Sequence, residues 1–497
     1  MSSPVNIPFQ SFISIDRDSS TSIYLQITFQ FINAIQRGYL PTGLKLPGSR
    51  TLSELLGVHR KTIIAVYEEL DAQGWVQIHS NRGTFILDKE PEKIKIKSSE
   101  SLQLYSYPRQ TGFSFNKTNI LDNPYEYGDF LYRWNDGTPD YRVTQIETFT
   151  KFYSASLKRK QNQKKWAYSK EEGSIYFRKQ LSNYLNLTRG LHISDKNILI
   201  TRGVDASIYI ISQILLEKGD KVVVAETSYF AINMIFQKNG AQILTIPIDK
   251  YGIQVDKLRE LCEHTTIRAL YLTPHNHYPT TVTLSGSRRM ELLQLADEFG
   301  FVILEDDYDY EFQYDKNTTL PIASADTNGM VVYVGSFGKT LPPGFRTGFV
   351  VAPENLIYEM RKYLGIIDRE GDIMMEQVLG ELIEEGEIHR HLKKSIKIYQ
   401  QRRNNFANIL KETFGNDINY QIPTGGLAYW IEWQKSVNLL KISQECVKYN
   451  LLIPRTLLYQ NKSITAMRIG FGHLTTEEMK NSIEILSKSI VSISTSH

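Results

Sequence analysis

Residues 331–353 read VVYVGSFGKTLPPGFRTGFVVAP, and this stretch decides the fold of the larger part of the chain. An apolar run, 331–334, precedes a loop rich in glycine and proline that carries Lys339. A lysine just past a buried strand meets ligands at the carboxyl edge of a sheet. Burial lowers the pKa of a lysine, and the neutral amine forms a Schiff base with an aldehyde cofactor. Ser336 and Arg346 flank the lysine and suit a phosphate, although a surface loop with ordinary charges is the alternative.

A second polar stretch lies upstream, where residues 301–312 read FVILEDDYDYEF. A strand that ends in consecutive acids places carboxylates at the carboxyl edge of the sheet. One acid opposite a pyridine nitrogen would keep that nitrogen protonated and make the ring an electron sink. The alternatives are a solvated acidic strand end and a metal site built from Asp306, Asp307 and Asp309. No histidine or additional carboxylate has ligand spacing here, so we expect no metal.

Short apolar runs recur between helical stretches over most of the chain. The strand candidates are 198–201, 222–225, 243–246, 269–273, 302–305 and 331–334. Helical periodicity lies between most of them, as at 204–216 and 288–299. This alternation predicts an α/β fold, with a mostly parallel sheet covered by helices on both faces. After Tyr358 helical patterns predominate and predict a separate small C-terminal lobe.

A different pattern occupies residues 46–86, which read LPGSRTLSELLGVHRKTIIAVYEELDAQGWVQIHSNRGTFI. The predicted elements are helices over 23–37, 49–56 and 59–73, followed by strands over 75–79 and 83–87. Gly57 is the turn between the last two helices. A helix-turn-helix of this size can place its second helix in the major groove of DNA.

Basic and polar side chains stand where this unit would meet DNA. Between residues 37 and 62 there are five basic residues and one acid. Side chains at the N-terminus of the second helix can reach base edges and phosphates, and the hairpin tip suits the minor groove or the backbone. The candidate DNA contacts are Arg50, His59, Arg60, Lys61, Thr62, Arg82 and Gly83. The alternative is a small helical bundle with a solvated basic face.

These patterns divide the chain into three segments. Residues 21–88 form the DNA-binding domain, and 124–497 form the α/β domain. Between them, 89–123 begin with KEPEKIKIKSSES and show no sustained periodicity, which predicts a linker. Such a linker would let the small domain move or reach a neighbouring subunit.

Composition narrows the class of protein further. The chain has 497 residues and a formal net charge of +3, so DNA contact must come from a local patch. The two cysteines share no short motif, which argues against disulfides and suits a reducing cytoplasm. We find no signal peptide and no run long enough to span a membrane. We therefore expect a cytoplasmic protein without a membrane partner.

The stretch 46–86 closely resembles the winged-helix domain of the GntR superfamily. The matching elements are the leading LP.SR, the LGV.R.T turn, the Y..L...G[WY] run and the closing G[TS][FY][VI] wing, in that order. The resemblance implies binding to double-stranded operator DNA. His59 stands where the family has Ser or Thr, and Ile64 is apolar where some members contact DNA.

From about Trp134 onward, the chain resembles fold-type I pyridoxal-phosphate (PLP) proteins of the aspartate aminotransferase class. The stretches EDDYDYEF and GSFGKTLPPGFRTG are especially similar to the large domain of MocR-type regulators, which share this domain order. The resemblance implies that Lys339 holds PLP as an aldimine and that Asp306 pairs with the pyridine nitrogen. Tyr308 would hydrogen-bond the ring oxygen O3′.

Further roles follow from the same resemblance. Ser336 and Arg346 would bind the phosphate, together with the backbone N–H groups of Val204 and Asp205 in TRGVDAS, at a helix N-terminus. Tyr229 in AETSYF matches the aromatic side chain that lies against the ring.

Two stretches near the C-terminal half bear on substrate recognition. In AMRIGFGHL, Arg468 matches the arginine that grips a substrate carboxylate, with a surface ion pair as the alternative. In TPHNHYPTT, Tyr278 replaces the Asn of N-P-x-G that bonds O3′, and Thr281 replaces the Gly. The nearby side chains of residues 275–277 could substitute for that Asn. This change favours regulation over efficient transamination.

Together, these features predict a PLP-dependent transcriptional regulator that senses a small amine, an amino acid or PLP itself through an aldimine at Lys339. By resemblance it would be a homodimer whose two winged helices read two half-sites. The alternatives are a catalytically active PLP-dependent aminotransferase and a DNA-binding protein whose large domain only dimerises.

Overall fold

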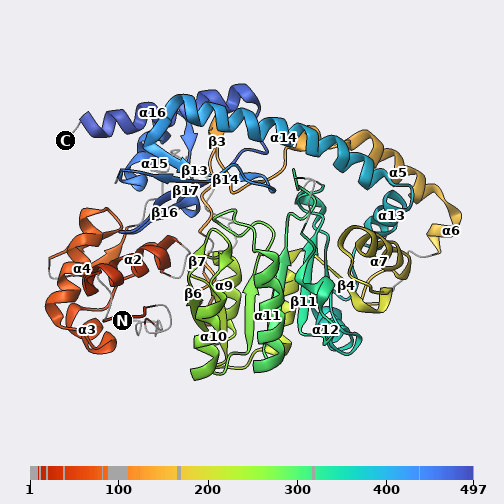
Figure 1. Cartoon of the computed structure of the whole chain (residues 1–497), viewed down its shortest axis with the longest axis horizontal. Helices are drawn as coiled ribbons and strands as arrows, with labels where there is room; N and C mark the ends of the chain where they lie inside the picture. The colour runs from red at the N-terminus through yellow and green to blue at the C-terminus, as the bar shows by residue number, and fades with distance from the viewer. Residues whose placement is uncertain are drawn as a thin grey trace. The chain divides into compact units, whose positions relative to one another are not determined.

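The computed structural model describes residues 9, 13–17, 21–36, 40–80, 82–87, 110–122, 124–164, 170–315, 319–341, 343–435 and 437–495. These residues fall into two compact units, 1–124 and 125–497 (Figure 1). Residues 88–109, which include most of the predicted linker 89–123, and Asn123 lie outside the described residues. Among the described residues, no helix is long and apolar enough to cross a lipid bilayer.

The first unit is a three-helix fold with a short hairpin. Its elements are α2 (Ile23–Gln36), α3 (Ser49–Leu56), α4 (Arg60–Ala72), β1 (Val76–His79) and β2 (Gly83–Ile86). Gly57 ends α3 with a φ of 63°, a left-handed conformation that glycine adopts without strain. Phe31, Leu52 and Ile63 are fully buried between the helices. The helix-turn-helix and the two strands predicted from the sequence are therefore present.

The second unit contains a seven-stranded sheet in the order β4-β12-β11-β10-β9-β5-β6. Its strands are β4 (Ile198–Thr201), β5 (Lys221–Ala225), β6 (Gln242–Ile246), β9 (Ala269–Leu272), β10 (Val302–Asp307), β11 (Val331–Ser336) and β12 (Gly348–Val351). All neighbouring pairs are parallel except those made by β12, which runs antiparallel to β11 and β4. The α/β fold with a mostly parallel sheet is confirmed.

Helices cover both faces of this sheet. One face packs against α8 (Val204–Leu215), α9 (Phe230–Lys238) and α12 (Glu354–Ile367). The other packs against α10 (Val255–His264), α11 (Gly286–Phe299), α7 (Ile175–Arg189) and α13 (Ile373–Glu384). This unit also contains the helices α5 (Ile146–Lys158) and α6 (Lys160–Gln163) and a small hairpin of β7 (Ile248–Asp249) and β8 (Gly252–Ile253).

The C-terminal lobe differs from the prediction in two ways. It contains a four-stranded antiparallel sheet, β13 (Ile418–Tyr420), β14 (Ala428–Trp433), β17 (Thr465–Gly470) and β16 (Leu458–Gln460). This sheet packs with α14 (Glu387–Phe414), α15 (Leu439–Val447) and α16 (Thr476–Thr495). The lobe also does not start after Tyr358, because α12 packs on α8 and β4. Helical periodicity identifies a helix but not the sheet that it covers.

The segment that opens the second unit also joins this lobe. Strand β3 (Tyr132–Arg133) pairs in parallel with β15 (Leu451–Leu452). The Asn135 backbone accepts a hydrogen bond from Gly470 of β17. Contacts with segments more than 300 residues later in the chain therefore position residues 134–140 at the edge of the large sheet where ligands bind.

Candidate functional site

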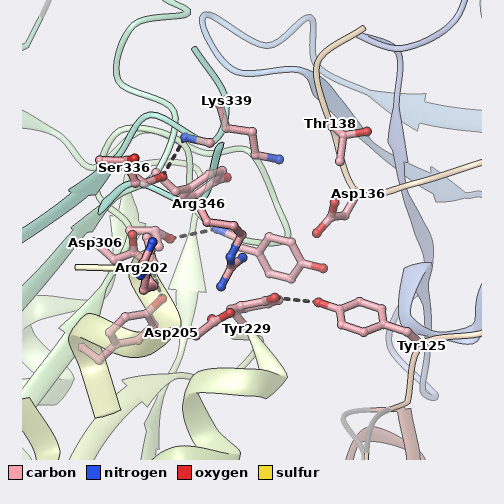
Figure 2. Close-up of a pocket in the computed structure, with 18 residues that line it drawn as sticks. Tyr125, Asp136, Thr138, Arg202, Asp205, Tyr229, Asp306, Ser336, Lys339 and Arg346 are labelled. Atoms are coloured by element: carbon pink, nitrogen blue, oxygen red, sulfur yellow. Dashed lines mark hydrogen bonds between the residues drawn. The ribbon is translucent and has the colours of Figure 1, made fainter. Parts of the chain in front are cut away.

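A cavity of about 370 Å³ opens at the carboxyl ends of β4, β9, β10 and β11 (Figure 2). This is where ligands bind in open α/β sheets. Nine residues expected to bind the cofactor line it together: Lys339, Asp306, Tyr308, Ser336, Arg346, Val204, Asp205, Tyr229 and Tyr278. Strand order explains the convergence, because these residues come from separate strand ends and the loops that follow them.

Asp306 lies at the floor of the cavity, inside β10 rather than after it. Its side chain is buried, and Oδ2 accepts a 2.7 Å hydrogen bond from the Tyr271 hydroxyl. Its other oxygen, Oδ1, is buried and has no hydrogen-bond partner among the described residues. Burial raises the pKa of Asp306 to about 8. A buried acceptor without a donor is costly, so the site lacks one proton donor at this oxygen.

Lys339 follows β11 and projects into the cavity (Figure 2). Its Nζ donates a 2.6 Å hydrogen bond to the Gly137 carbonyl. Burial lowers the pKa of Lys339, and the negative charge of Asp136 opposes that effect. A lowered pKa favours the neutral, nucleophilic amine that Schiff-base chemistry requires.

The first turn of α8 forms a cradle beside this lysine. Gly203 precedes the helix with a φ of 122°, a conformation that L-residues rarely adopt. The Arg346 guanidinium lies against it, 3.7 Å from the position that a Cβ on Gly203 would occupy. A Cβ on Gly348 would lie 2.6 Å from the Gly203 Cα, so β12 and this turn approach backbone to backbone. The free N–H groups of the helix N-terminus and the guanidinium suit an anion.

Tyrosine rings form one wall of the cavity. The rings of Tyr229 and Tyr278 have centroids 5.0 Å apart. The Tyr229 hydroxyl lies 2.7 Å from that of Tyr125, the first residue of the second unit (Figure 2). Tyr125 also packs edge-on against Phe230, with ring centroids 5.4 Å apart.

The expectation that a side chain of residues 275–277 replaces the missing Asn at the cavity is wrong, because none of the three lines it. His275 pairs with Asp307 at 2.9 Å, and the His277 ring contacts Thr280 at 2.9 Å. Asn276 donates to Asp309. This stretch bends and turns after β9, and of its residues only Thr273 and Tyr278 line the cavity.

Arg468 does not line the cavity. It is 1% exposed and donates to the carbonyls of Asp136 and Pro279 at 2.9 and 2.8 Å. It also donates to the Tyr308 hydroxyl at 3.2 Å, and that hydroxyl donates to the Asn276 carbonyl at 2.8 Å. Arg468 is thus no surface ion pair, and its three nitrogens already have protein acceptors.

The three acids considered for a metal site have separate partners. Asp307 binds His275 and accepts from the Tyr333 hydroxyl, whereas Asp309 accepts from Asn276 and Asp306 accepts from Tyr271. Among the described residues, no group of three or more His, Cys, Asp or Glu side chains could hold a metal ion.

Sequence reasoning missed part of the lining. The additional residues are Tyr125, Asp136, Thr138, Arg202, Gly203, Tyr271, Thr273, Gly338 and Thr347. Gly203, Gly338 and Thr347 adjoin stretches already recognised. Tyr125, Asp136 and Thr138 come from far upstream, and nothing in their local pattern indicates a ligand.

The candidate DNA-binding residues lie in the first unit. Arg50 lies in the first turn of α3, and Arg60, Lys61 and Thr62 form the first turn of α4. His59 is exposed, and its Nδ1 accepts a 3.2 Å hydrogen bond from the Lys61 backbone, so it serves as the N-cap. Arg60 Nε donates to Ser49 Oγ at 3.2 Å, which ties the two helices together.

Arg82 and Gly83 lie at the tip of the β1–β2 hairpin. Lys45, which was not in the predicted set, forms an isolated bridge with Phe85 and places its Nζ 5.8 Å from that ring. Lys45 therefore adds a second basic side chain, besides Arg82, beside the hairpin.

The fold and cavity define an aminotransferase-like protein that carries a DNA-binding domain. Residues 131–486 match the family described as aminotransferase class I and II, and residues 23–86 match bacterial regulatory proteins of the gntR family. The first match covers most of the chain, which therefore belongs to the aminotransferase class I and II family.

Known proteins match either most of the chain or mainly its second unit. Over 462 residues the chain is 26% identical to YdfD of Bacillus subtilis, an uncharacterized HTH-type transcriptional regulator, covering 93% of this chain and 94% of YdfD. It is 24% identical to the probable rhizopine catabolism regulatory protein MocR of Rhizobium meliloti, covering 79% and 78%. Kynurenine aminotransferase of Pyrococcus horikoshii superposes with a TM-score of 0.68 at 25% identity, covering 73% of this chain and 91% of that one. The chain is a GntR-type regulator of the MocR kind with an aminotransferase-like domain.

The family implies pyridoxal phosphate as cofactor, and the residues present fit it. A protonated pyridine nitrogen supplies the donor that Asp306 Oδ1 lacks. The cradle at Gly203 and Arg346 suits a phosphate, and Lys339 supplies the primary amine. The cofactor of this protein is thus pyridoxal phosphate.

Proposed function

We propose that this chain regulates transcription by coupling the state of its PLP cavity to operator binding by its winged helix. The ligand that it senses is a small amine, an amino acid or PLP itself. One observation carries the proposal. Tyr125, the first residue after the DNA-binding unit, stands in the wall of the cofactor cavity. The first residue of the second unit thus belongs to the ligand site.

Within this proposal, each side chain of the cavity has a distinct task. Lys339 Nζ would hold the cofactor, and Asp306 would hold a proton on its ring nitrogen. Ser336, Arg346 and the first N–H groups of α8, at Val204 and Asp205, bind the phosphate. Tyr229 and Tyr278 line the cavity and would exclude water from a bound cofactor. When bound, PLP supplies an aldehyde that condenses with primary amines and a ring that withdraws electrons.

Tyr308 has a positioning task in this proposal. Its hydroxyl links Arg468 to the Asn276 carbonyl, and its ring lies 5.8 Å from Lys339 Nζ. Tyr308 would therefore connect the cofactor with Arg468, so that a shift in the position of either one would affect the other.

On the DNA side, the first turn of α4 is the reading surface, and the hairpin tip contacts the backbone or the minor groove. The exposed residues at the start of α4 carry two positive charges, Arg60 and Lys61. Phosphate contacts fix the position of the helix, and Thr62 with His59 meets base edges. The remaining contacts are Arg50, Arg82 and Gly83.

Coupling requires two states that differ in ligand affinity. The Tyr125–Tyr229 hydrogen bond links the end of the linker to a residue of the cavity wall. A ligand that moves Tyr229 changes the anchoring of Tyr125, and the linker transmits that change.

The decisive experiment measures binding of the full chain to a DNA fragment that it selects from a random library. Binding is compared without PLP, with PLP, and with PLP plus a panel of primary amines and amino acids. We expect at least one addition to shift the affinity several-fold, and Lys339→Ala to abolish the shift while still binding DNA. An operator affinity that stays the same without PLP, with PLP and with every member of the panel would overturn the proposal.

Transamination is the second candidate, favoured by the lowered pKa of Lys339 beside an intact Asp306. The shielding of Arg468 inside the protein weighs against it. Repeated turnover of an amino acid with a keto acid would establish the enzyme. A single slow conversion of the cofactor would fit the regulator.

We further propose that the chain acts as a homodimer, as the fold commonly does. Two winged helices would then read two half-sites of a palindromic operator. Sedimentation of the holoprotein should give twice the 57.3 kDa chain mass. A monomer at working concentration would contradict this arrangement.

A further inference from the structure

Ile64 is an exposed apolar side chain in the middle of the surface that we expect to meet DNA. It begins the second turn of α4 and is 38% exposed, whereas the neighbouring Ile63 is fully buried. In an α-helix each residue is rotated by about 100° from the one before it, so Ile64 projects between Arg60 and Lys61, one turn further along. The exposed basic face at the start of α4 therefore has an apolar centre.

The same face of α4 becomes acidic beyond Ile64. Glu68 lies one turn after Ile64, Asp71 lies about one turn after Glu68, and both are exposed. Carboxylates repel the phosphates of DNA, so only the first two turns of the helix can approach the groove closely. Ile64 is thus the last residue of this face that a base pair can reach.

The polar side chains around Ile64 are partly engaged within the protein. His59 Nδ1 accepts a hydrogen bond from the Lys61 backbone at 3.2 Å. Arg60 Nε donates a hydrogen bond to Ser49 Oγ at 3.2 Å. These bonds leave fewer polar groups to read base edges. Ile64 has no polar group to engage, so it can recognise a base only by an apolar contact.

Local helix stability does not account for an isoleucine at position 64. A β-branched side chain on an exposed helix surface is a poorer helix former than Ala, Lys or Glu, because its rotamers are restricted there. A position that breaks the local preference with little gain in packing is one where function is expected. In the major groove, the apolar group that a base pair presents is the C5 methyl group of thymine.

We propose that Ile64 reads a thymine of the operator by packing on its C5 methyl group. This inference rests on the proposed placement of α4 in the major groove, and it does not depend on PLP. The contact removes apolar carbon on both sides from water, which favours thymine over the other bases. Ile64 is then a specificity-determining residue, whereas Lys61 supplies affinity that is independent of sequence.

The test uses the full-length holoprotein and the DNA site that it selects from a random library. Each thymine of the selected site is replaced in turn by deoxyuridine, which removes only the methyl group. Dissociation constants are measured at one salt concentration, because affinity for DNA depends on salt. We expect replacement of at least one thymine to weaken binding about fourfold, the value for one apolar carbon removed from water.

Ile64→Ala shortens the side chain and places a good helix former at this exposed position. We expect this variant to bind the thymine and deoxyuridine sites equally well, and a repeated selection to lose the preference for thymine there. Leu55→Ala is the matched control, because Leu55 lies on α3 of the same unit and is 42% exposed. It should keep the ratio between the two sites. Melting temperatures verify that each variant is folded.

A selected site in which no thymine responds to deoxyuridine, or a response that persists in Ile64→Ala, would overturn the inference. Operator affinity with and without PLP and amines is measured on the same samples. If the thymine preference depends on Ile64 while the affinity never responds to PLP or amines, the base contact stands and the proposed regulation fails. The converse result would overturn the base contact and leave the proposed regulation standing.

Discussion

Asp306 is a buried side chain that only a bound cofactor would supply with its second hydrogen-bond donor. Tyr271 satisfies one of its oxygens, and the other has no donor among the described residues. Without a donor the carboxyl holds its proton, because burial raises its pKa to about 8 from 3.8. A protonated pyridine ring reverses that preference, since the ionised acid then gains a partner.

The raised pKa of Asp306 makes the stability of the cofactor-free protein depend on pH. The folded chain binds more protons at Asp306 than the unfolded chain between pH 3.8 and about 8. The contribution of Asp306 to the free energy of unfolding is therefore complete below pH 3.8 and is lost as the pH rises through 8. Between the two pKa values the free energy of unfolding falls by about 1.4 kcal/mol for each pH unit. Calorimetry of wild type and Asp306→Asn should show the wild type losing stability relative to the variant over this range.

The loaded protein serves as the comparison for that measurement. Bound PLP lets Asp306 ionise, so the pH-dependent difference should shrink when the cofactor is present. Asp306→Asn should weaken PLP binding about tenfold to a hundredfold, the loss of one charge-assisted hydrogen bond. A variant with unchanged PLP affinity would show that Oδ1 does not meet the ring.

At the scale of elements, the phosphate cradle depends on the approach of β12 to the first turn of α8. A Cβ on Gly348 would meet the Gly203 Cα at 2.6 Å, and neither backbone can rotate away as a side chain would. Gly348→Ala should lower the free energy of unfolding by about 1–3 kcal/mol, as overpacking does, and should weaken PLP binding. Thermal unfolding and cofactor titration measure both effects.

Gly286→Ala is the matched control, because its added methyl meets nothing within 4 Å at the start of α11. It should leave PLP affinity unchanged. Equal behaviour of the two variants would mean that β12 and α8 separate readily and do not define the cradle.

The start of α4 provides the second prediction at this scale. Lys61→Ala should weaken binding to all DNA sequences and reduce the slope of affinity against salt by about 0.9, the value for one lost phosphate contact. Electrophoretic mobility shifts over a range of salt concentrations measure the slope. Lys257→Ala removes an equal charge from α10 and should leave it unchanged. His59→Ser should retain the fold, because Ser also caps a helix.

At the scale of the whole molecule, Tyr125 is the residue through which we expect the ligand cavity to reach the linker. Tyr125→Phe removes the hydrogen bond to Tyr229 and keeps the packing on Phe230. It should retain PLP binding within a few-fold, keep basal operator affinity, and reduce the ligand-induced change in that affinity. Tyr125→Ala should abolish the change. A full response in both variants would exclude this route.

Local patterns predicted the parts of the molecule whose structure depends on neighbours in the chain. The helix Ser49–Leu56 and the strand Ile198–Thr201 have the predicted bounds. The antiparallel strand β12 was not predicted, because the four residues Gly348–Val351 carry no signal for direction or partner. The C-terminal sheet was also missed: its central strands, β14 and β17, are separated in the chain by α15, and local periodicity does not reveal that they pair.

The amino-acid sequence alone established the order of the two domains and the candidates Lys339, Asp306, Ser336 and Arg346, because each stands at a strand end or a glycine turn within one local pattern. The folded chain was needed to show that Tyr125 and Asp136 face the same cavity and that Arg468 is held outside it. Those placements depend on contacts between segments more than 300 residues apart, such as Arg468 with Asp136. No local pattern encodes contacts of that range.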